Sequence, residues 1–74
     1  MNFMDDLAKS YRGEASFYVV DIDKSPEIAQ KLNVSHLPRI ICFKKLRQMG
    51  SILGNKQDKI FNFVLTHTLE NDDI

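Results

Sequence analysis

The only strong nucleophile in this sequence is the thiol of Cys42, the single cysteine among 74 residues. Catalysis of disulfide exchange requires one thiol that attacks and a second thiol that resolves the mixed disulfide. A single cysteine therefore excludes a complete dithiol cycle, an internal disulfide and a cysteine-based metal cluster. Ile40, Ile41 and Phe43 flank Cys42, and burial among apolar side chains disfavours the reactive thiolate. We interpret Cys42 as a small apolar residue of a buried strand.

The remaining polar groups lack the partners that catalysis or metal binding requires. His36 and His67 have no cysteine, aspartate or glutamate at metal-ligand spacing, so we expect no metal site. Asp21 and Asp23 share one face of a predicted strand, but we expect them to end that strand and to cap the helix that begins near Ser25. The sequence has no glycine-rich phosphate loop, and we expect no cofactor.

The composition describes one small globular domain, residues 1–74, rather than a nucleic-acid or membrane protein. Ten basic and ten acidic residues cancel, whereas nucleic acids and anionic membranes select a clustered positive surface. The short basic run at residues 44–47 has no interleaved aromatic residues for base stacking. No apolar run approaches the roughly 20 residues that span a bilayer. Without a disulfide, we expect a reducing compartment and name the cytoplasm.

These groups must be positioned by a series of short helices and strands. Apolar residues at helical spacing predict helices, and runs of aromatic and β-branched residues predict strands. The predicted order is helix 2–12, strand 16–22, helix 25–33, strand 39–43, strand 47–53 and a closing helix that runs to residue 69. This α-β-α-β-β-α order indicates an α/β protein with a mixed sheet.

Turn residues separate the predicted elements. Asn2 can cap the first helix, and Pro26 fits the first position of the second helix. Gly13 and Asn33 stand where left-handed backbone ends a helix. The turn of the last hairpin falls on Lys45 and Leu46, which lack the glycine or asparagine that tight hairpin turns favour. We expect Gly50 to relieve this turn as a bulge in the following strand.

The ordered set of motifs resembles the thioredoxin family. Residues 17–23 resemble its central strand with terminal aspartates, and residues 27–34 resemble the short helix that follows. His36-Leu37-Pro38 occupies the position of the family's cis-proline loop. Residues 40–45 are similar to the next strand, and Gly54 stands at the spacing of a late glycine. The resemblance implies a thioredoxin-like three-layer α/β/α fold that is truncated at its N-terminus.

The departures from the family bear directly on function. The resemblance covers about the C-terminal two-thirds of the family's domain, so the segment with the Cys-x-x-Cys motif has no counterpart here. The family usually has threonine after the proline, whereas this sequence has Arg39. In relatives the proline loop exposes backbone that pairs with an extended peptide, which implies peptide binding at His36, Leu37, Pro38 and Arg39.

The missing segment includes the strand that would separate residues 16–22 from residues 39–43. Three outcomes remain open: the two strands pair directly, a second copy or another protein inserts a strand, or the chain is a fragment of a longer gene product. We expect a redox-inactive thioredoxin-like domain that acts as a protein-interaction or structural module. The possible partners are a protein or extended peptide at the Pro38 loop or the strand edges, or a strand-exchanged homodimer. The alternative is a fragment of an active thiol–disulfide oxidoreductase, serving cell redox homeostasis, whose Cys-x-x-Cys lies upstream of Met1.

Overall fold

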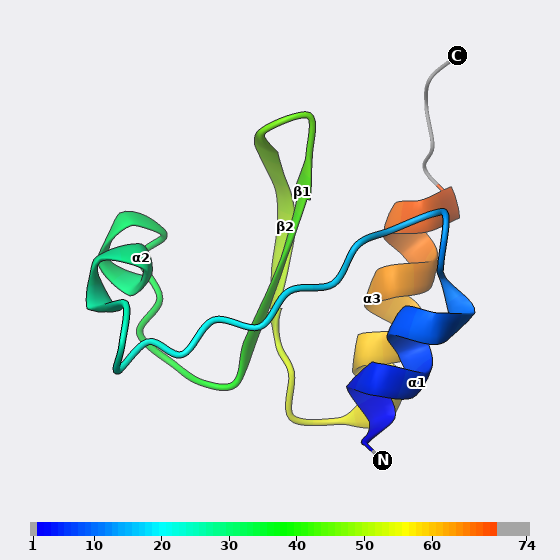
Figure 1. The fold of residues 1–74 in the computed structure, drawn as a ribbon, viewed down its shortest axis with the longest axis horizontal. Helices are drawn as coiled ribbons and strands as arrows, with labels where there is room; N and C mark the ends of the chain where they lie inside the picture. Colours follow the sequence, from blue (N-terminus) through cyan, green and yellow to red (C-terminus); the bar gives the residue numbers. More distant parts are fainter. Residues whose placement is uncertain (1, 70–74) are drawn as a thin grey trace.

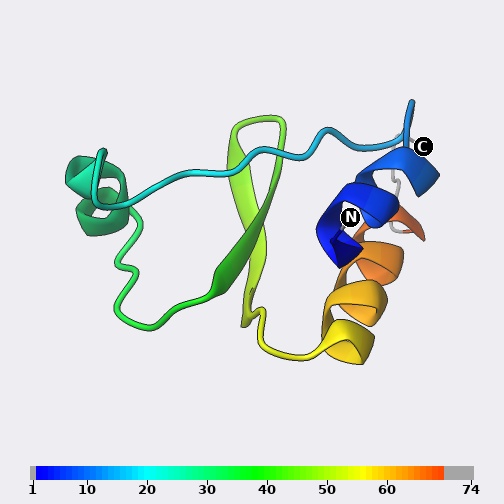
Figure 2. The same ribbon diagram turned by 60° about the horizontal axis from the view of Figure 1, so that its bottom comes forward.

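The computed structural model describes residues 2–69 and contains three helices and one hairpin over that range. Along the chain these are α1 (Phe3–Ser10), α2 (Pro26–Lys31), β1 (Arg39–Lys44), β2 (Arg47–Leu53) and α3 (Gln57–Leu69). Helices α1 and α3 lie side by side on one side of the hairpin, and α2 lies on the other side (Figure 1). The turned view in Figure 2 shows the same arrangement. The predicted α/β class with its three layers is therefore confirmed.

The described core lies between α1 and α3. Leu7 of α1 is 4% exposed, and Ile60 and Val64 of α3 are buried against it. Five partly buried residues pack on this cluster. Phe17 follows α1 and Ile40 belongs to β1; the other three, from the first helix and its end, are Phe3, Met4 and Tyr11. Burying one such aliphatic side chain contributes about 1.5–3 kcal/mol, so three buried residues make a small core.

Helix α1 begins where its sequence predicts but ends at Ser10, two residues before the predicted end. The side-chain oxygen of Asn2 accepts a hydrogen bond from the Asp5 amide at 2.8 Å, which caps the first turn. Asp5 and Asp6 lie in that turn, where the helix dipole favours negative charge. Gly13 adopts a φ of 90° just beyond the helix, as expected for a left-handed end.

Strands β1 and β2 form an antiparallel hairpin with a tight turn at Lys45 and Leu46. Both turn residues have positive φ, 52° and 68°, which is the conformation that matches the twist of paired strands. The register shifts between Cys42, which pairs with Gly50, and Phe43, which pairs with Gln48. The second strand therefore has the expected bulge, but its extra residue is Met49 and not Gly50, which stays paired with Cys42.

The predicted strand at residues 16–22 does not form. The structure has extended chain through residue 21 and a turn from residue 22, and the only described sheet is the two-stranded hairpin. Figure 1 shows this segment, in cyan, crossing the hairpin on its way from α1 to α2 without joining it. Residues 16–22 have the apolar pattern of a strand, but a strand also needs a neighbour to accept its backbone hydrogen bonds. The predicted mixed sheet is therefore wrong, and of the three outcomes left open, the direct pairing of residues 16–22 with β1 does not occur.

Helix α2 begins at Pro26, as predicted, but its cap differs from the prediction. Ser25 stands at the N-cap position without a capping hydrogen bond from its side chain. Asp21 instead closes the preceding turn: its carboxylate accepts the Asp23 amide at 2.9 Å, and its carbonyl accepts the Ser25 amide at 3.0 Å. Asn33, with a φ of 56°, ends the helix as expected. The predicted capping of α2 by Asp21 and Asp23 is therefore replaced by a turn that leads into the helix.

Candidate functional site: the Pro38 loop

The loop at residues 36–39, which we call the Pro38 loop, leads from α2 into the start of β1. The Leu37–Pro38 peptide bond is cis. The carbonyl of Pro38 accepts a hydrogen bond from the Gly54 amide at 2.8 Å, just beyond the last residue pair of the hairpin. This bond anchors the C-terminal end of the loop to β2.

The exposed centre of the loop is Leu37. Its side chain is 56% exposed, and among residues 2–69 no hydrogen bond involves its backbone. An unpaired amide and carbonyl at the start of a strand can form main-chain hydrogen bonds with an extended peptide. Leu37 therefore offers both a main-chain contact and an apolar side chain to a partner.

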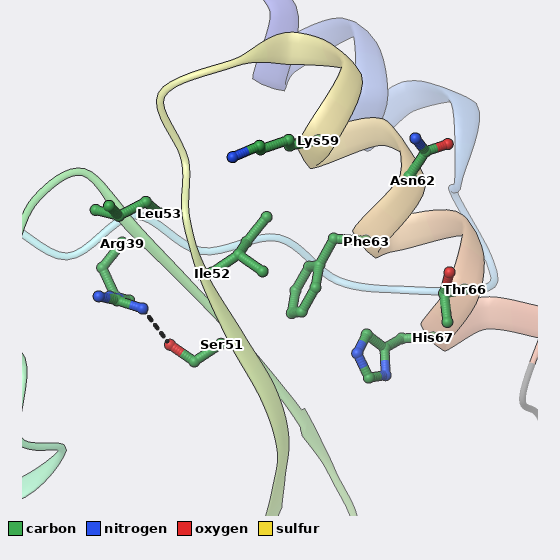
Figure 3. Close-up of a pocket in the computed structure, with 9 residues that line it drawn as sticks. All are labelled: Arg39, Ser51, Ile52, Leu53, Lys59, Asn62, Phe63, Thr66 and His67. Carbon is green, nitrogen blue, oxygen red and sulfur yellow. Dashed lines mark hydrogen bonds between the residues drawn. The ribbon is translucent and has the colours of Figure 1, made fainter.

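Two polar side chains flank this centre. The Nδ1 atom of His36 lies 3.0 Å from the Ser35 hydroxyl. Arg39 donates from Nη1 to the Ser51 hydroxyl at 3.1 Å, which holds the guanidinium beside β2 (Figure 3). Because a guanidinium has five N–H donors, this bond leaves Arg39 able to bind a carboxylate or a peptide carbonyl.

Cys42 is not part of the Pro38 loop. It lies four residues further along β1, and at about 3.4 Å per residue this places it about 13 Å from Pro38. The residue is partly exposed rather than buried, which corrects the prediction of a fully covered strand. The reason is that β1 has no neighbour on its outer side among residues 2–69.

An open groove separates β1 from residues 16–22, and no single residue pattern marks it in the sequence. Its volume is about 950 Å³. The groove is bounded by β1 on one side and residues 14–22 on the other, with apolar residues of the α2 region at its end, including Ile28, Ala29, Leu32 and Val34. Leu37 and Arg39 line it too, so the groove is continuous with the Pro38 loop.

A second, shallower hollow of about 690 Å³ lies between β2 and α3. Figure 3 shows Phe63 and His67 projecting from α3 toward the strand, with Lys59 near the start of the helix. The two rings meet edge to face with their centroids 4.6 Å apart. A Cβ atom at Gly50 would lie 2.8 Å from the His67 ring, so the glycine makes room for this contact. His67 therefore serves packing between helix and hairpin.

No group of three or more histidine, cysteine, aspartate or glutamate side chains within residues 2–69 is arranged to hold a metal ion. Over the same residues, no helix has the length and apolar character needed to cross a membrane.

Two helical layers around a β-hairpin, with a cis-proline loop leading into its first strand, define a domain of the three-layer α/β class. The sequence comparisons identify the family within that class. The thioredoxin family model matches residues 1–66, and the chain belongs to this family. Its membership and its truncated fold agree with the resemblance seen in the sequence.

Several curated relatives are thioredoxins. The chain is 34% identical over 67 residues to thioredoxin M4, chloroplastic, of Arabidopsis thaliana, which covers 90% of this chain and 31% of the relative. It is 35% identical over 51 residues to the chloroplastic M-type thioredoxin of Spinacia oleracea, covering 69% and 28%. It is 31% identical over 51 residues to the thioredoxin of Staphylococcus aureus, covering 69% and 49%.

The chain thus spans half or less of the length of these relatives. No solved structure matches it significantly.

Proposed function

We propose that this chain is a non-catalytic, redox-inactive member of the thioredoxin family that binds an extended segment of another protein at the Pro38 loop. The observation that carries the proposal is the unpaired backbone of Leu37, which stands beside an exposed apolar side chain and the Arg39 guanidinium. An extended partner would gain main-chain hydrogen bonds from Leu37 and a charged contact from Arg39.

The absence of catalysis follows from the number and position of thiols. Cys42 is the only cysteine, so an attacked disulfide would remain attached to the protein as a mixed disulfide. Its distance of about 13 Å from Pro38 along β1 also keeps it away from a peptide held at the loop. The protein would act in a reducing compartment, for which we propose the cytoplasm.

Peptide binding is tested with a matched pair of leucine variants. Leu37→Asp places a charge at the centre of the Pro38 loop, and Leu46→Asp places the same charge on a leucine that is 99% exposed at the hairpin turn. Peptides are selected on the 74-residue chain from a phage-displayed library of random heptapeptides, and affinities are then measured by fluorescence anisotropy. We expect Leu37→Asp to weaken binding at least tenfold and Leu46→Asp to leave it unchanged. Equal losses in both variants, or no selected peptide, would contradict the proposal.

Redox inactivity is tested separately by reduction of insulin with dithiothreitol as the reductant. We expect the chain to give the rate of dithiothreitol alone. A rate that rises in proportion to the protein concentration would overturn this part of the proposal.

A second candidate is that the chain is the C-terminal part of an active thiol–disulfide oxidoreductase. The short coverage of its relatives favours this reading, because the chain spans only 28–49% of their lengths. The nucleotide sequence before the codon for Met1 distinguishes the two candidates. An in-frame Cys-x-x-Cys there supports the oxidoreductase, and a stop codon directly before Met1 refutes it.

A further inference from the structure

The open groove is lined by β1 and by residues 16–22, and on the groove side neither segment has a strand partner within the described residues. Because the Gly54 amide donates to the Pro38 carbonyl, the main chain of Pro38 points its polar group toward the second strand of the hairpin. In an antiparallel pair every second residue points its N–H and C=O away from the partner strand, which here applies to Arg39 and Ile41. Their polar groups therefore face the groove, where β1 has no described neighbour.

The opposite edge of the groove is residues 16–22. From Phe17 to Val20 no backbone group forms a hydrogen bond within the described part of the chain. Tyr18 is 86% exposed, Val19 is 96% exposed and Val20 is 49% exposed. Aromatic and β-branched residues of this kind favour strands. The chain therefore contains both a groove that lacks a strand and a strand-forming segment that lacks neighbours.

The exposed area of the chain matches what a second copy would cover. Its accessible surface is 6079 Å². A folded monomer of 8.6 kDa exposes about 4,700 Å² by the usual scaling with mass. Even if the six residues outside the described range were as exposed as in an unfolded chain, an excess of about 750 Å² would remain. Each partner in a stable interface buries about 800 Å².

Electrostatics favour a second copy of this chain as the occupant. The formal net charge at pH 7 is zero, so two copies approach each other without net repulsion. The groove and the segment that would fill it are also both present in every copy, which satisfies the requirement of a two-fold interface for a self-complementary surface.

We propose that two copies of this chain form a closed dimer in which residues 16–22 of each copy lie as a β-strand in the groove of the other. The dimer forms one sheet that begins with β2 and β1 of the first copy. Next come residues 16–22 of the second copy and residues 16–22 of the first copy. The sheet ends with β1 and β2 of the second copy. Each groove receives one strand, and the two-fold axis passes between the two central strands. The dimer does not rest on the proposed peptide binding at the Pro38 loop, although Arg39 belongs to both the loop and the groove.

The test compares two proline variants of the 74-residue chain by sedimentation equilibrium at 10–100 µM. Val19→Pro removes an amide that the dimer needs and the monomer does not use. Asn55→Pro is the control, since Asn55 is exposed in the connection between β2 and α3 and forms no described hydrogen bond. Far-UV circular dichroism checks that both variants keep the helices.

We expect the wild-type chain and Asn55→Pro to sediment at twice 8.6 kDa. We expect Val19→Pro to dimerise with a dissociation constant about 100-fold higher than that of the wild type, because the substitution occurs twice in the dimer. Hydrogen exchange gives a second readout that needs no variant. The amides of residues 18–20 exchange slowly in the dimer and at free-peptide rates in a monomer.

A wild-type monomer with fast exchange at residues 18–20 overturns the dimer, and so does an open series of larger species. A Val19→Pro that dimerises as tightly as the wild type, or a monomeric Asn55→Pro, overturns the assignment to residues 16–22. A monomer whose residues 18–20 become protected only when a library-selected peptide is added shows that another protein fills the groove. That last result refutes the dimer while leaving the proposed peptide binding intact.

Discussion

Gly54 is the residue whose replacement tests most directly how the Pro38 loop is held. Its amide donates to the Pro38 carbonyl, and a Cβ atom at this position would lie 2.8 Å from Cδ1 and 2.9 Å from Cγ1 of Ile40. Carbon atoms in good contact lie about 3.5–4.0 Å apart. Gly54 does not have the positive φ that disfavours side chains, so the cost of Gly54→Ala arises from this contact alone.

The expected loss of stability follows from two opposing effects. Overpacking in a close-packed region costs about 1–3 kcal/mol. The lower backbone entropy of alanine in the unfolded chain offsets about 0.4–1 kcal/mol of that cost. Gly54→Ala should therefore lower the free energy of unfolding by about 1–2 kcal/mol, a large fraction of the stability of so small a domain.

A double-mutant cycle with Ile40→Val identifies the contact responsible. The valine lacks Cδ1, the nearest atom, and alone should cost about 0.5–1.5 kcal/mol. Because valine keeps Cγ1, the substitution relieves only part of the clash, and the combined variant should lose less than the sum of the single losses by about 0.5 kcal/mol. Gly13→Ala is the control, because Gly13 has a φ of 90° and open space around its Cβ position. Its cost is backbone strain, which Ile40→Val should leave unchanged.

Urea unfolding followed by circular dichroism measures all of these variants at one protein concentration, because a dimer makes the midpoint depend on concentration. With a slope of about 1 kcal/mol/M, Gly54→Ala should lower the midpoint by about 1–2 M. The contact with Ile40 would be refuted if Gly54→Ala were neutral or stabilising, or if its loss simply added to that of Ile40→Val.

Three further outcomes follow from the described contacts. Leu7→Ala removes the most buried core side chain and should lower the free energy of unfolding by about 2–5 kcal/mol. We expect the cooperative thermal transition to be lost. A transition at an unchanged temperature would contradict this core. Asn2→Ala removes the cap of α1 and should cost about 1 kcal/mol, with faster exchange of the Asp5 amide; unchanged exchange of that amide would show that the cap is not formed. Cys42→Ser should leave the insulin-reduction rate at that of dithiothreitol alone. It should also change the free energy of unfolding in urea by no more than about 1 kcal/mol, since the thiol is only partly buried. A reduction rate below that of the wild type would reveal a catalytic thiol.

Most of the local structure was readable from the sequence. Asn2 caps the first helix, Pro26 begins the second, and Gly13 and Asn33 take the left-handed conformations that end helices. These features depend on interactions within one turn of chain, so residue type and spacing are sufficient to predict them. The family was also readable, because its motifs keep their order and spacing over residues 1–66.

The strand at residues 16–22 was predicted and is absent, because its existence depends on a distant neighbour. Residues 17–20 have the side chains of a strand, but the sequence does not show which backbone lies beside them. The same limit applies to Cys42, whose apolar neighbours predicted full burial while the open side of β1 leaves it partly exposed.

What the sequence determined by itself is the absence of a dithiol pair, the family, and the identity of each helix and hairpin strand. These are properties of composition and of neighbours along the chain. Only the tertiary structure decided that β1 and residues 16–22 stay apart, and that the Gly54 amide ties the Pro38 loop to β2. The physical reason is that hydrogen bonding between separate segments depends on their relative placement, which packing of the helices sets and residue spacing does not encode.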